Sequence, residues 1–262
     1  MTLAEQGGQS RDPGSPAASA GRPGNGSART EGRALDTTSL PRTRIQKRNT
    51  RAILDAALEV FSTLGFAGAT LDRIAESAGL SKPNLLYYFA SKDAIYRALI
   101  SDTLETWLAP LRDLGPDGDP AEEIVAYVLR KLDMARAYPR ESRLFAHEIL
   151  QGAPRILDIV EGPLRNLVDE KAALIESWAS AGRIAPVDAH HLIFSIWATT
   201  QHYADFDVQV RAILRPEGEA HFDAAARHLD TLYRRLLVPA AGGSTAESLQ
   251  VPFRTSGKPT RG

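Results

Sequence analysis

The stretch that decides the fold is TLDRIAESAGLSKPNLLYYFASK, residues 70–92. Thr70 can cap a first short helix, LDRIAESA, and Ser81 can cap a second, in which Pro83 is tolerated in the first turn. Gly79 lies between them and supplies the left-handed residue that commonly ends a helix. Two short helices joined by a tight glycine turn, behind a longer supporting helix, are the layout of a helix-turn-helix.

Longer helices are predicted on both sides of this pair. Asn49 or Thr50 can cap the preceding helix, whose apolar residues recur every three or four positions up to a stop at Gly65. Ser91 can cap a long following helix, which Pro110 is expected to kink or end. Alternating runs typical of strands are missing from the sequence. The fold class is therefore predicted to be all-α.

The second short helix is predicted to bury one face and expose the other. Leu85, Leu86 and Phe89 are expected to face the core. The residues left outward, toward a DNA major groove, are Lys82, Pro83, Asn84, Tyr87 and Tyr88. Between positions 42 and 92 the basic residues outnumber the acidic ones by four, in a chain of net charge −1. A basic head on an acidic remainder is the footprint of a DNA-binding domain joined to another domain.

Composition narrows the cellular setting and the possible chemistry. Cysteine is absent, which excludes disulfides, thiolate metal sites and cysteine nucleophiles, and fits a reducing cytoplasm. No apolar run approaches ~18 residues, and the N-terminus lacks the apolar centre of a signal peptide. The sequence therefore predicts a cytoplasmic protein that spans no membrane.

The chain is expected to hold two helical domains between two tails. Residues 1–42 and 239–262 are rich in Gly, Ser, Pro and Ala and are predicted to be disordered. The arginines of the first tail also permit a second interpretation, a basic arm that grips DNA. The head is assigned to 43–108, with its helix-turn-helix at about 70–89, and an effector-binding and dimerisation domain to 109–238. Helices in that domain are predicted at 121–138, 140–151, 155–180, 188–211 and 217–237, which makes about nine in the whole chain.

The last predicted helix carries a continuous apolar stripe, formed by Phe222, Ala225, Leu229, Leu232, Tyr233 and Leu236. Together with the helix at 188–211 it is expected to build the interface of a homodimer. Two heads on one DNA need a fixed spacing of about one helical turn or a multiple, which a rigid helical interface provides. The alternative is that the stripe packs only within its own chain.

Residues 56–99, AALEVFSTLGFAGATLDRIAESAGLSKPNLLYYFASKDAIYRAL, resemble the three-helix head of the TetR family of dimeric bacterial repressors. The resemblance implies a homodimer on palindromic operator DNA. It assigns phosphate contacts to Thr70, Tyr88 and Lys92, and base contacts to Lys82, Pro83, Asn84 and Tyr87. Leu86 stands where many members carry tyrosine, so the contact usual there passes to Tyr87. The candidate DNA-binding residues are thus Thr70, Ser81, Lys82, Pro83, Asn84, Tyr87, Tyr88 and Lys92.

Later segments, among them SRLFAHEILQGAP and HLIFSIWATTQHYADFDVQV, resemble the pyrimidine-utilisation repressors of the same family. The resemblance implies a small-molecule effector, uracil or thymine. Uracil is a flat ring with neighbouring N–H and C=O groups, so an indole can stack on it and a primary amide can meet its edge. Trp197, Gln201 and Asp205 are four residues apart and share one helix face. They line either the effector pocket or the dimer seam; Trp107 and Trp178 are further candidates for the pocket, or core residues.

The sequence contains no complete enzyme motif. His147 and Glu148 begin an HExxH-like run, but Gln151 stands where a helical zinc site needs its second histidine. His190 and His191 are adjacent and point to different sides of a helix. No cofactor is expected. The alternatives to a pyrimidine-responsive repressor are a repressor of the same family that answers a different small molecule, and a DNA-bound factor whose second domain contacts another protein.

Overall fold

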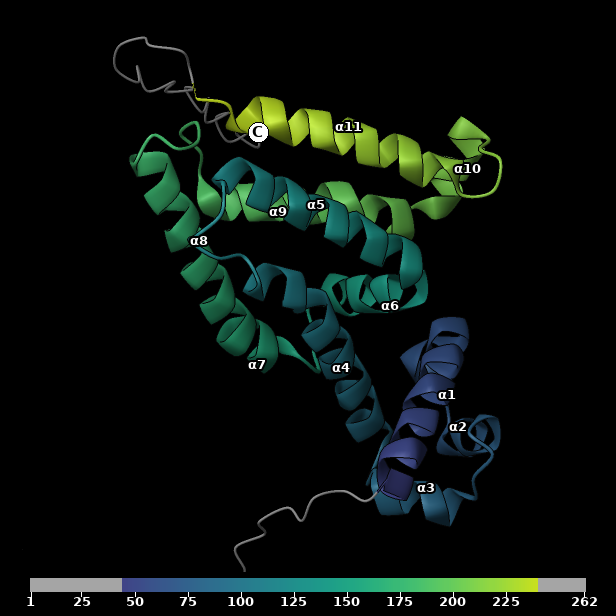
Figure 1. Cartoon of the computed structure of the whole chain (residues 1–262). Coiled ribbons are helices and arrows are strands. Elements are labelled where there is room, and N and C mark those ends of the chain that lie inside the picture. The colour runs from purple at the N-terminus through teal and green to yellow at the C-terminus, as the bar shows by residue number, and fades with distance from the viewer. Residues whose placement is uncertain (1–43, 240–262) are drawn as a thin grey trace, which may run out of the picture. The chain divides into compact units, whose positions relative to one another are not determined.

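The computed structural model describes residues 44–239, and this part of the chain is helical, without a strand (Figure 1). The all-α fold class is confirmed. The predicted N-terminal tail and nearly all of the C-terminal one lie outside the described residues. Within the described part no helix is long and apolar enough to cross a membrane.

The head contains four helices: α1 (Arg44–Gly68), α2 (Leu71–Ser77), α3 (Lys82–Tyr88) and α4 (Lys92–Arg112). The three predicted caps are confirmed, because each hydroxyl accepts a hydrogen bond from the backbone N–H three residues on. The distances are 3.2 Å at Thr70, 3.3 Å at Ser81 and 3.1 Å at Ser91. Gly79 has a φ of +67°, the left-handed conformation expected between α2 and α3.

Three details of the head differ from the sequence-based expectation. Helix α1 begins at Arg44, so Asn49 and Thr50 lie inside it and cap nothing. Gly65 adopts φ 66° and ψ 174°, which breaks the helical path, but α1 resumes and ends at Gly68. Of the two outcomes expected at Pro110, an end of the helix is excluded, because α4 continues to Arg112.

The head's core is formed by side chains from all four helices. They include Ile53, Phe61, Ile74, Leu85, Ile95 and Tyr96, each at most 1 % exposed. Leu85 and Phe89 are buried as predicted, whereas Leu86 is 39 % exposed and was wrongly assigned to the core. Neighbouring residues of a helix point about 100° apart, so Leu86 turns away from the side on which Leu85 is buried.

The second domain holds the remaining helices: α5 (Pro120–Ala137), α6 (Pro139–Leu150), α7 (Leu157–Ile159), α8 (Arg165–Ser180), α9 (Ala189–Asp205), α10 (Asp207–Leu214) and α11 (Ala220–Leu237). A π-helical turn, η1 (Val160–Leu164), joins α7 to α8 and contains Pro163. The single helix predicted for 155–180 is therefore interrupted, because proline cannot donate the backbone hydrogen bond of a regular turn. The helix predicted for 188–211 is also divided, at Phe206.

Helix α5 packs against both α9 and α11, and α9 also packs against α6 and α8. Helix α6 additionally contacts α1 and α4 of the head. Helix α6 thus contacts both long helices of the head, and α4 also contacts α5 and α8. The packing of α9 places its predicted effector stripe beside α5 and α6.

The apolar stripe of α11 is used mostly inside the chain. Phe222, Ala225, Leu229 and Tyr233 are at most 6 % exposed and face the other helices of the domain. Leu232 and Leu236 remain 41 % and 46 % exposed. The intramolecular alternative therefore accounts for four of the six stripe residues, and only the outer two are left for a dimer interface.

Candidate nucleic-acid interface and effector pocket

The outward face of α3 carries an exposed group of polar and aromatic side chains. Lys82, Pro83 and Asn84 are exposed at its first turn, and Tyr87 is 72 % exposed one turn later. The ammonium of Lys82 forms an ion pair with Asp72 at 2.9 Å, and both partners remain accessible to solvent. Asn84 uses its backbone N–H for the Ser81 cap, and within residues 44–239 its side chain makes no hydrogen bond.

Tyr88 behaves differently from its neighbour Tyr87. Its ring is half-buried, and its hydroxyl accepts a hydrogen bond of 2.8 Å from Nδ2 of Asn49 on α1. The two tyrosine rings meet edge to face, 5.2 Å between centroids. Tyr88 thus fixes α3 against α1, while Tyr87 is exposed and its hydroxyl accepts only a long hydrogen bond of 3.5 Å from Nε2 of Gln46 on α1.

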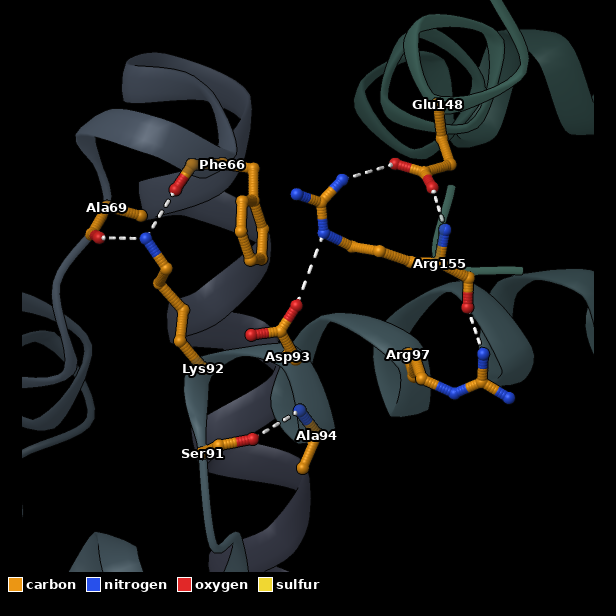
Figure 2. A network of polar contacts seen from close by, with 9 residues as sticks. All are labelled: Phe66, Ala69, Ser91, Lys92, Asp93, Ala94, Arg97, Glu148 and Arg155. Carbon is orange, nitrogen blue, oxygen red and sulfur yellow. Dashed lines mark hydrogen bonds and ion pairs between the residues drawn. The ribbon is translucent and has the colours of Figure 1, made fainter. Parts of the chain in front are cut away.

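Lys92 was expected to hold a DNA phosphate, and the structure gives it an internal role that the sequence did not reveal. Its ammonium donates to the carbonyls of Phe66 at 2.8 Å and Ala69 at 3.0 Å (Figure 2). It also lies 4.4 Å from the centroid of the Phe66 ring. These carbonyls follow the break at Gly65 and lack regular helical partners, so Lys92 closes the end of α1.

A second polar cluster joins the head to α6. The buried carboxylate of Glu148 accepts from the backbone N–H of Arg155 at 2.9 Å and from its guanidinium at 3.3 Å. The same guanidinium forms an ion pair of 3.4 Å with Asp93 on α4 and lies over the ring of Phe66. Figure 2 shows Arg155 reaching from the segment after α6 to groups on both sides of this junction. Burial and the neighbouring Glu148 carboxylate raise the pKa of Tyr96.

The turn between Glu148 and Arg155 has an uncommon backbone. Gly152 and Ala153 both have positive φ, 86° and 54°. Alanine adopts this conformation only at a cost in energy, so surrounding contacts must hold it. One such contact is the hydrogen bond of 2.9 Å from the Ala153 N–H to the Glu148 carbonyl. Arg97 adds another link, donating to the Arg155 carbonyl and pairing with Asp158 at 2.8 Å.

A cavity of about 690 Å³ opens between α6 and α9. Three of the predicted effector residues, Trp197, Gln201 and Asp205, line it together. The facing wall comes from α6 and η1 and includes Phe145, Ile149, Leu150, Val160 and Leu164. The stripe on α9 therefore borders a pocket with a largely apolar opposite wall, the setting usual for a small-molecule site.

Hydrogen bonds orient the polar residues of this pocket. The indole N–H of Trp197 donates to the hydroxyl of Tyr127 on α5 at 2.7 Å. Asp205 accepts a hydrogen bond of 2.5 Å from the hydroxyl of Ser142, and burial raises the pKa of its carboxyl group. No hydrogen bond within the described residues occupies the side-chain amide of Gln201. That amide remains available to a ligand.

The other two predicted effector residues lie elsewhere. Trp107 is buried on α4, lines a smaller cavity of about 170 Å³ and carries the ammonium of Lys131 over its ring, 4.4 Å from the centroid. Trp178 is buried in the core on α8 and does not line the pocket beside α9. Of the two alternatives for Trp178, a pocket residue or a core residue, the structure therefore supports the core residue, which is also the more common role of a buried indole.

Sequence reasoning missed Lys131, which is 4 % exposed. A signal for it was present, because Ile124, Val128, Lys131 and Ala135 follow helical spacing and the three apolar members are all buried. A lysine within such a stripe is unusual, since buried lysines are rare unless paired. Glu148 and Arg155 gave no comparable signal, because their meeting depends on the turn that separates α6 from α7.

Family models match almost all of this helical region. The model described as "Bacterial regulatory proteins, tetR family" matches residues 53–99, and that described as "YcdC-like protein, C-terminal region" matches residues 100–240. The chain belongs to the TetR family. Its relatives are transcriptional regulators that bind operator DNA through a helix-turn-helix, usually as dimers with small-molecule effectors, and not enzymes.

Among curated TetR-family relatives, the HTH-type transcriptional regulator RutR of Escherichia coli K12 is 51 % identical over 180 residues. The match covers 69 % of this chain and 84 % of RutR, so it includes the second domain as well as the head. The A-factor receptor protein of Streptomyces griseus is 29 % identical over 142 residues, covering 52 % of this chain and 46 % of the relative. The resemblance stated from the sequence is confirmed at the level of a RutR-like TetR-family regulator.

Solved structures of the TetR family share the fold. A TetR-like transcriptional regulator from Rhodococcus sp. RHA1 superposes with a TM-score of 0.54 at 26 % identity, covering 75 % of this chain and 97 % of its own. The FadR regulator of Bacillus subtilis, solved with stearoyl-CoA, gives a TM-score of 0.54 at 18 % identity, over 70 % and 96 % of the two chains. At 18 % identity the likeness concerns the fold alone.

Proposed function

We propose that this chain represses pyrimidine-utilisation genes, binds palindromic operator DNA as a homodimer, and leaves it when uracil or thymine enters the pocket between α6 and α9. The observation that carries the effector assignment is the shared lining of that pocket by Trp197, Gln201 and Asp205. An indole face and an unoccupied amide are the groups suited to a flat ring with N–H and C=O edges. The 51 % identity to RutR over a 180-residue match, longer than the head, supports the same assignment.

The exposed face of α3 supports direct reading of DNA bases. Asn84 can make two hydrogen bonds to adenine in the major groove, and Lys82 can reach guanine if it leaves Asp72. Thr70 and Ser81 lie at helix N-termini, where backbone N–H groups and the helix dipole favour phosphate. Lys92 remains a proposed phosphate contact, although it would have to share its ammonium with two carbonyls.

The exposed apolar residues of α9 and α11 support the dimer. Phe194 is 49 % exposed on α9, and Leu232 and Leu236 are similarly exposed on α11. The two helices touch, because the hydroxyl of Tyr233 lies 3.2 Å from that of Ser195. A second copy of this surface would bury these side chains, as expected for the isologous contact of a twofold dimer.

Operator binding in the presence of uracil tests the effector assignment. Fluorescence anisotropy on labelled operator DNA should show that uracil releases the wild-type protein. Gln201→Leu should abolish this response and leave ligand-free DNA binding intact, because leucine keeps roughly the volume but leaves the polar groups of the ligand unpaired. Gln209→Leu, at an exposed glutamine outside the pocket lining, is the matched control and should respond normally.

The alternatives predict different outcomes in the same assay. If no pyrimidine releases the operator but another small molecule does, the protein is a TetR-family repressor with a different effector. If DNA binding is insensitive to every small molecule while a protein partner binds the second domain, the interaction factor is favoured. A Gln201→Leu variant that still responds to uracil would place Gln201 outside the effector site.

A further inference from the structure

The mouth of the pocket between α6 and α9 is rimmed by apolar side chains that face water. Among the residues that line this cavity, Ile149 is 40 % exposed, Phe206 is 56 % exposed and Leu150 is 82 % exposed. Small-molecule sites commonly remove most of the ligand's surface from water, whereas an exposed rim leaves part of a ligand uncovered. Exposed apolar residues that gather at one place, unlike those scattered singly, mark a docking surface.

The outward face of α9 joins this mouth to the proposed dimer surface. Phe194 belongs to that surface, and its ring centroid lies 5.8 Å from that of Trp197, which lines the pocket. Near the other end of α9, the ring of His202 stacks on Phe206 at the rim, with the centroids 5.1 Å apart. The proposed dimer surface and the pocket mouth are therefore continuous along this helix.

The exposed residues of α9 form one uncharged stripe. They are His191, Phe194, Ala198 and His202, at intervals of three or four residues, and none is Asp, Glu, Lys or Arg. Depletion of such charged residues is typical of the core of a protein–protein interface. In a twofold dimer the same patch meets its own copy, so a patch without one dominant charge avoids repelling itself. The stripe therefore suits a second copy of this chain.

A stable dimer also needs more surface than the side chains already assigned to it. Phe194, Leu232 and Leu236 are each between 41 % and 49 % exposed. A standard interface buries about 800 Å² on each partner, contributed by roughly 20–30 residues. The rim of the pocket extends the apolar surface along α9 and onto the end of α6, and a second copy already seated on Phe194 is the occupant nearest to it.

We propose that a second copy of the chain closes the mouth of the pocket, seated on Phe194, Leu150 and Phe206, so that the effector site is complete only in the dimer. The inference rests on the proposed function, which supplies the dimer and the effector, and adds that the two share one surface. The predicted stripe of α9 then belongs to a pocket that opens into the dimer seam. An effector enclosed in this way strengthens the dimer by the same factor by which dimerisation strengthens effector binding.

The reactivity of a single introduced thiol tests the closure without any ligand. The chain has no cysteine of its own, so Leu150→Cys adds the only thiol. Its rate of reaction with a maleimide is measured at protein concentrations over which sedimentation velocity shows dimer and monomer. Leu232→Glu, added to the same chain, supplies the monomer where dilution alone does not. The thiol should react about tenfold or more slowly in the dimer, because reactivity requires access.

Ile45→Cys is the matched control. Ile45 is 63 % exposed near the start of α1, and it lines neither the pocket nor the proposed dimer surface. Its thiol should react at the same rate in monomer and dimer.

The intrinsic fluorescence of the wild type gives a second reading, should the Leu150 variant fold or pair poorly. Trp107 and Trp178 are 4 % and 3 % exposed, whereas Trp197 is only partly buried, so acrylamide in the solvent reaches mainly Trp197. Quenching by acrylamide should therefore fall as the dimer forms. In Trp197→Phe the remaining quenching should not depend on protein concentration.

Sedimentation with uracil separates this inference from the pyrimidine assignment. Uracil should shift the equilibrium toward dimer, and uracil that binds without such a shift would overturn a site completed by the second copy. A Leu150→Cys thiol that the dimer protects, in a protein that binds no uracil, would support the closure and reject the pyrimidine.

Three further outcomes would overturn the closure. Equal thiol reactivity in monomer and dimer, with unchanged quenching, would leave the pyrimidine effector standing and leave the rim to a partner of another kind. Protection of the thiol that persists in the monomer would assign the cover to the same chain. A protein that stays monomeric at every concentration would overturn the closure and the proposed dimer together.

Discussion

The guanidinium carbon of Arg155 lies 3.5 Å from the centroid of the Phe66 ring, so the segment after α6 rests directly on the end of α1 (Figure 2). The arginine is held there by Glu148, whose carboxylate is almost completely buried. Glu148 belongs to α6, whose neighbouring residues line the effector pocket. One helix therefore presents side chains both to the pocket and to the head.

Glu148→Gln should destabilise the folded protein by about 2 kcal/mol or more, because it leaves the half-buried guanidinium of Arg155 without one of its counter-charges. Urea denaturation measures this loss. Asp158→Asn, which breaks the exposed Arg97–Asp158 pair nearby, should have little effect, since exposed pairs contribute little. Equal losses of unfolding free energy in the two variants would show that the buried Glu148 pair stabilises the protein no more than an exposed pair does.

The same Glu148 variant should weaken the communication between pocket and head, if it remains folded. Effector binding at α6 can change operator affinity only through contacts that differ between the two states. The measure is the ratio of operator affinities with and without uracil, which should fall toward one in Glu148→Gln. An unchanged ratio would assign the communication to other contacts of α6 with α1 and α4.

Asn84→Ala should lower operator affinity by about 1–3 kcal/mol and affect random DNA much less, because a lost base contact costs only where the right base is present. Binding of both DNAs is compared at one salt concentration, since phosphate contacts make affinity salt-dependent. Glu59→Ala, at an exposed position on α1, serves as the control. Equal losses on operator and random DNA would remove Asn84 from base reading.

Leu232→Glu should weaken dimerisation, because it places a charge on the apolar surface that α11 leaves exposed. Sedimentation velocity over a range of protein concentrations should show a shift toward monomer. Thr231→Glu introduces the same charge at an exposed position one residue earlier, about 100° around α11 from Leu232, and should remain dimeric. A dimer insensitive to both substitutions would place the interface elsewhere.

The stability of the wild type should rise with pH relative to Lys131→Met. Burial, partly offset by the charge of Asp205, lowers the pKa of Lys131 to about 8, whereas an unfolded lysine titrates near about 10.4. Between these values the unfolded state binds more protons, so the free energy of unfolding increases with pH. The wild type should gain about 2 kcal/mol over the variant from pH 7 to 9.5. A difference in unfolding free energy that stays constant from pH 7 to 9.5 would mean that burial does not destabilise the charged form of Lys131.

Local rules predicted the head more closely than the second domain. The caps at Thr70, Ser81 and Ser91 and the turn at Gly79 depend on the residue and its immediate neighbours, and the structure has all four. The break at Phe206 lies between Asp205 and Asp207, without a proline or glycine to mark it, so periodicity alone could not locate it.

Helical spacing likewise placed some of the candidate site residues and not others. Trp197, Gln201 and Asp205 could be placed together because they follow helical spacing, and they do line one cavity. Lys92 could not be placed, because its partners at Phe66 and Ala69 depend on how the end of α1 breaks at Gly65. Spacing along α5 could mark Lys131 as buried, but not its contact with Trp107, which lies on another helix.

We propose that a pyrimidine and the operator bind the same protein at two sites, each of which lowers the affinity of the other. Calorimetric titration of uracil into the free protein, and into the protein saturated with operator DNA, tests it most directly. Coupling between two binding sites is reciprocal, so operator should weaken uracil by the same factor by which uracil weakens operator. Uracil is expected to bind in both titrations, with an affinity lower by that factor in the second. Equal affinities with and without operator, or no binding to the free protein, would contradict it.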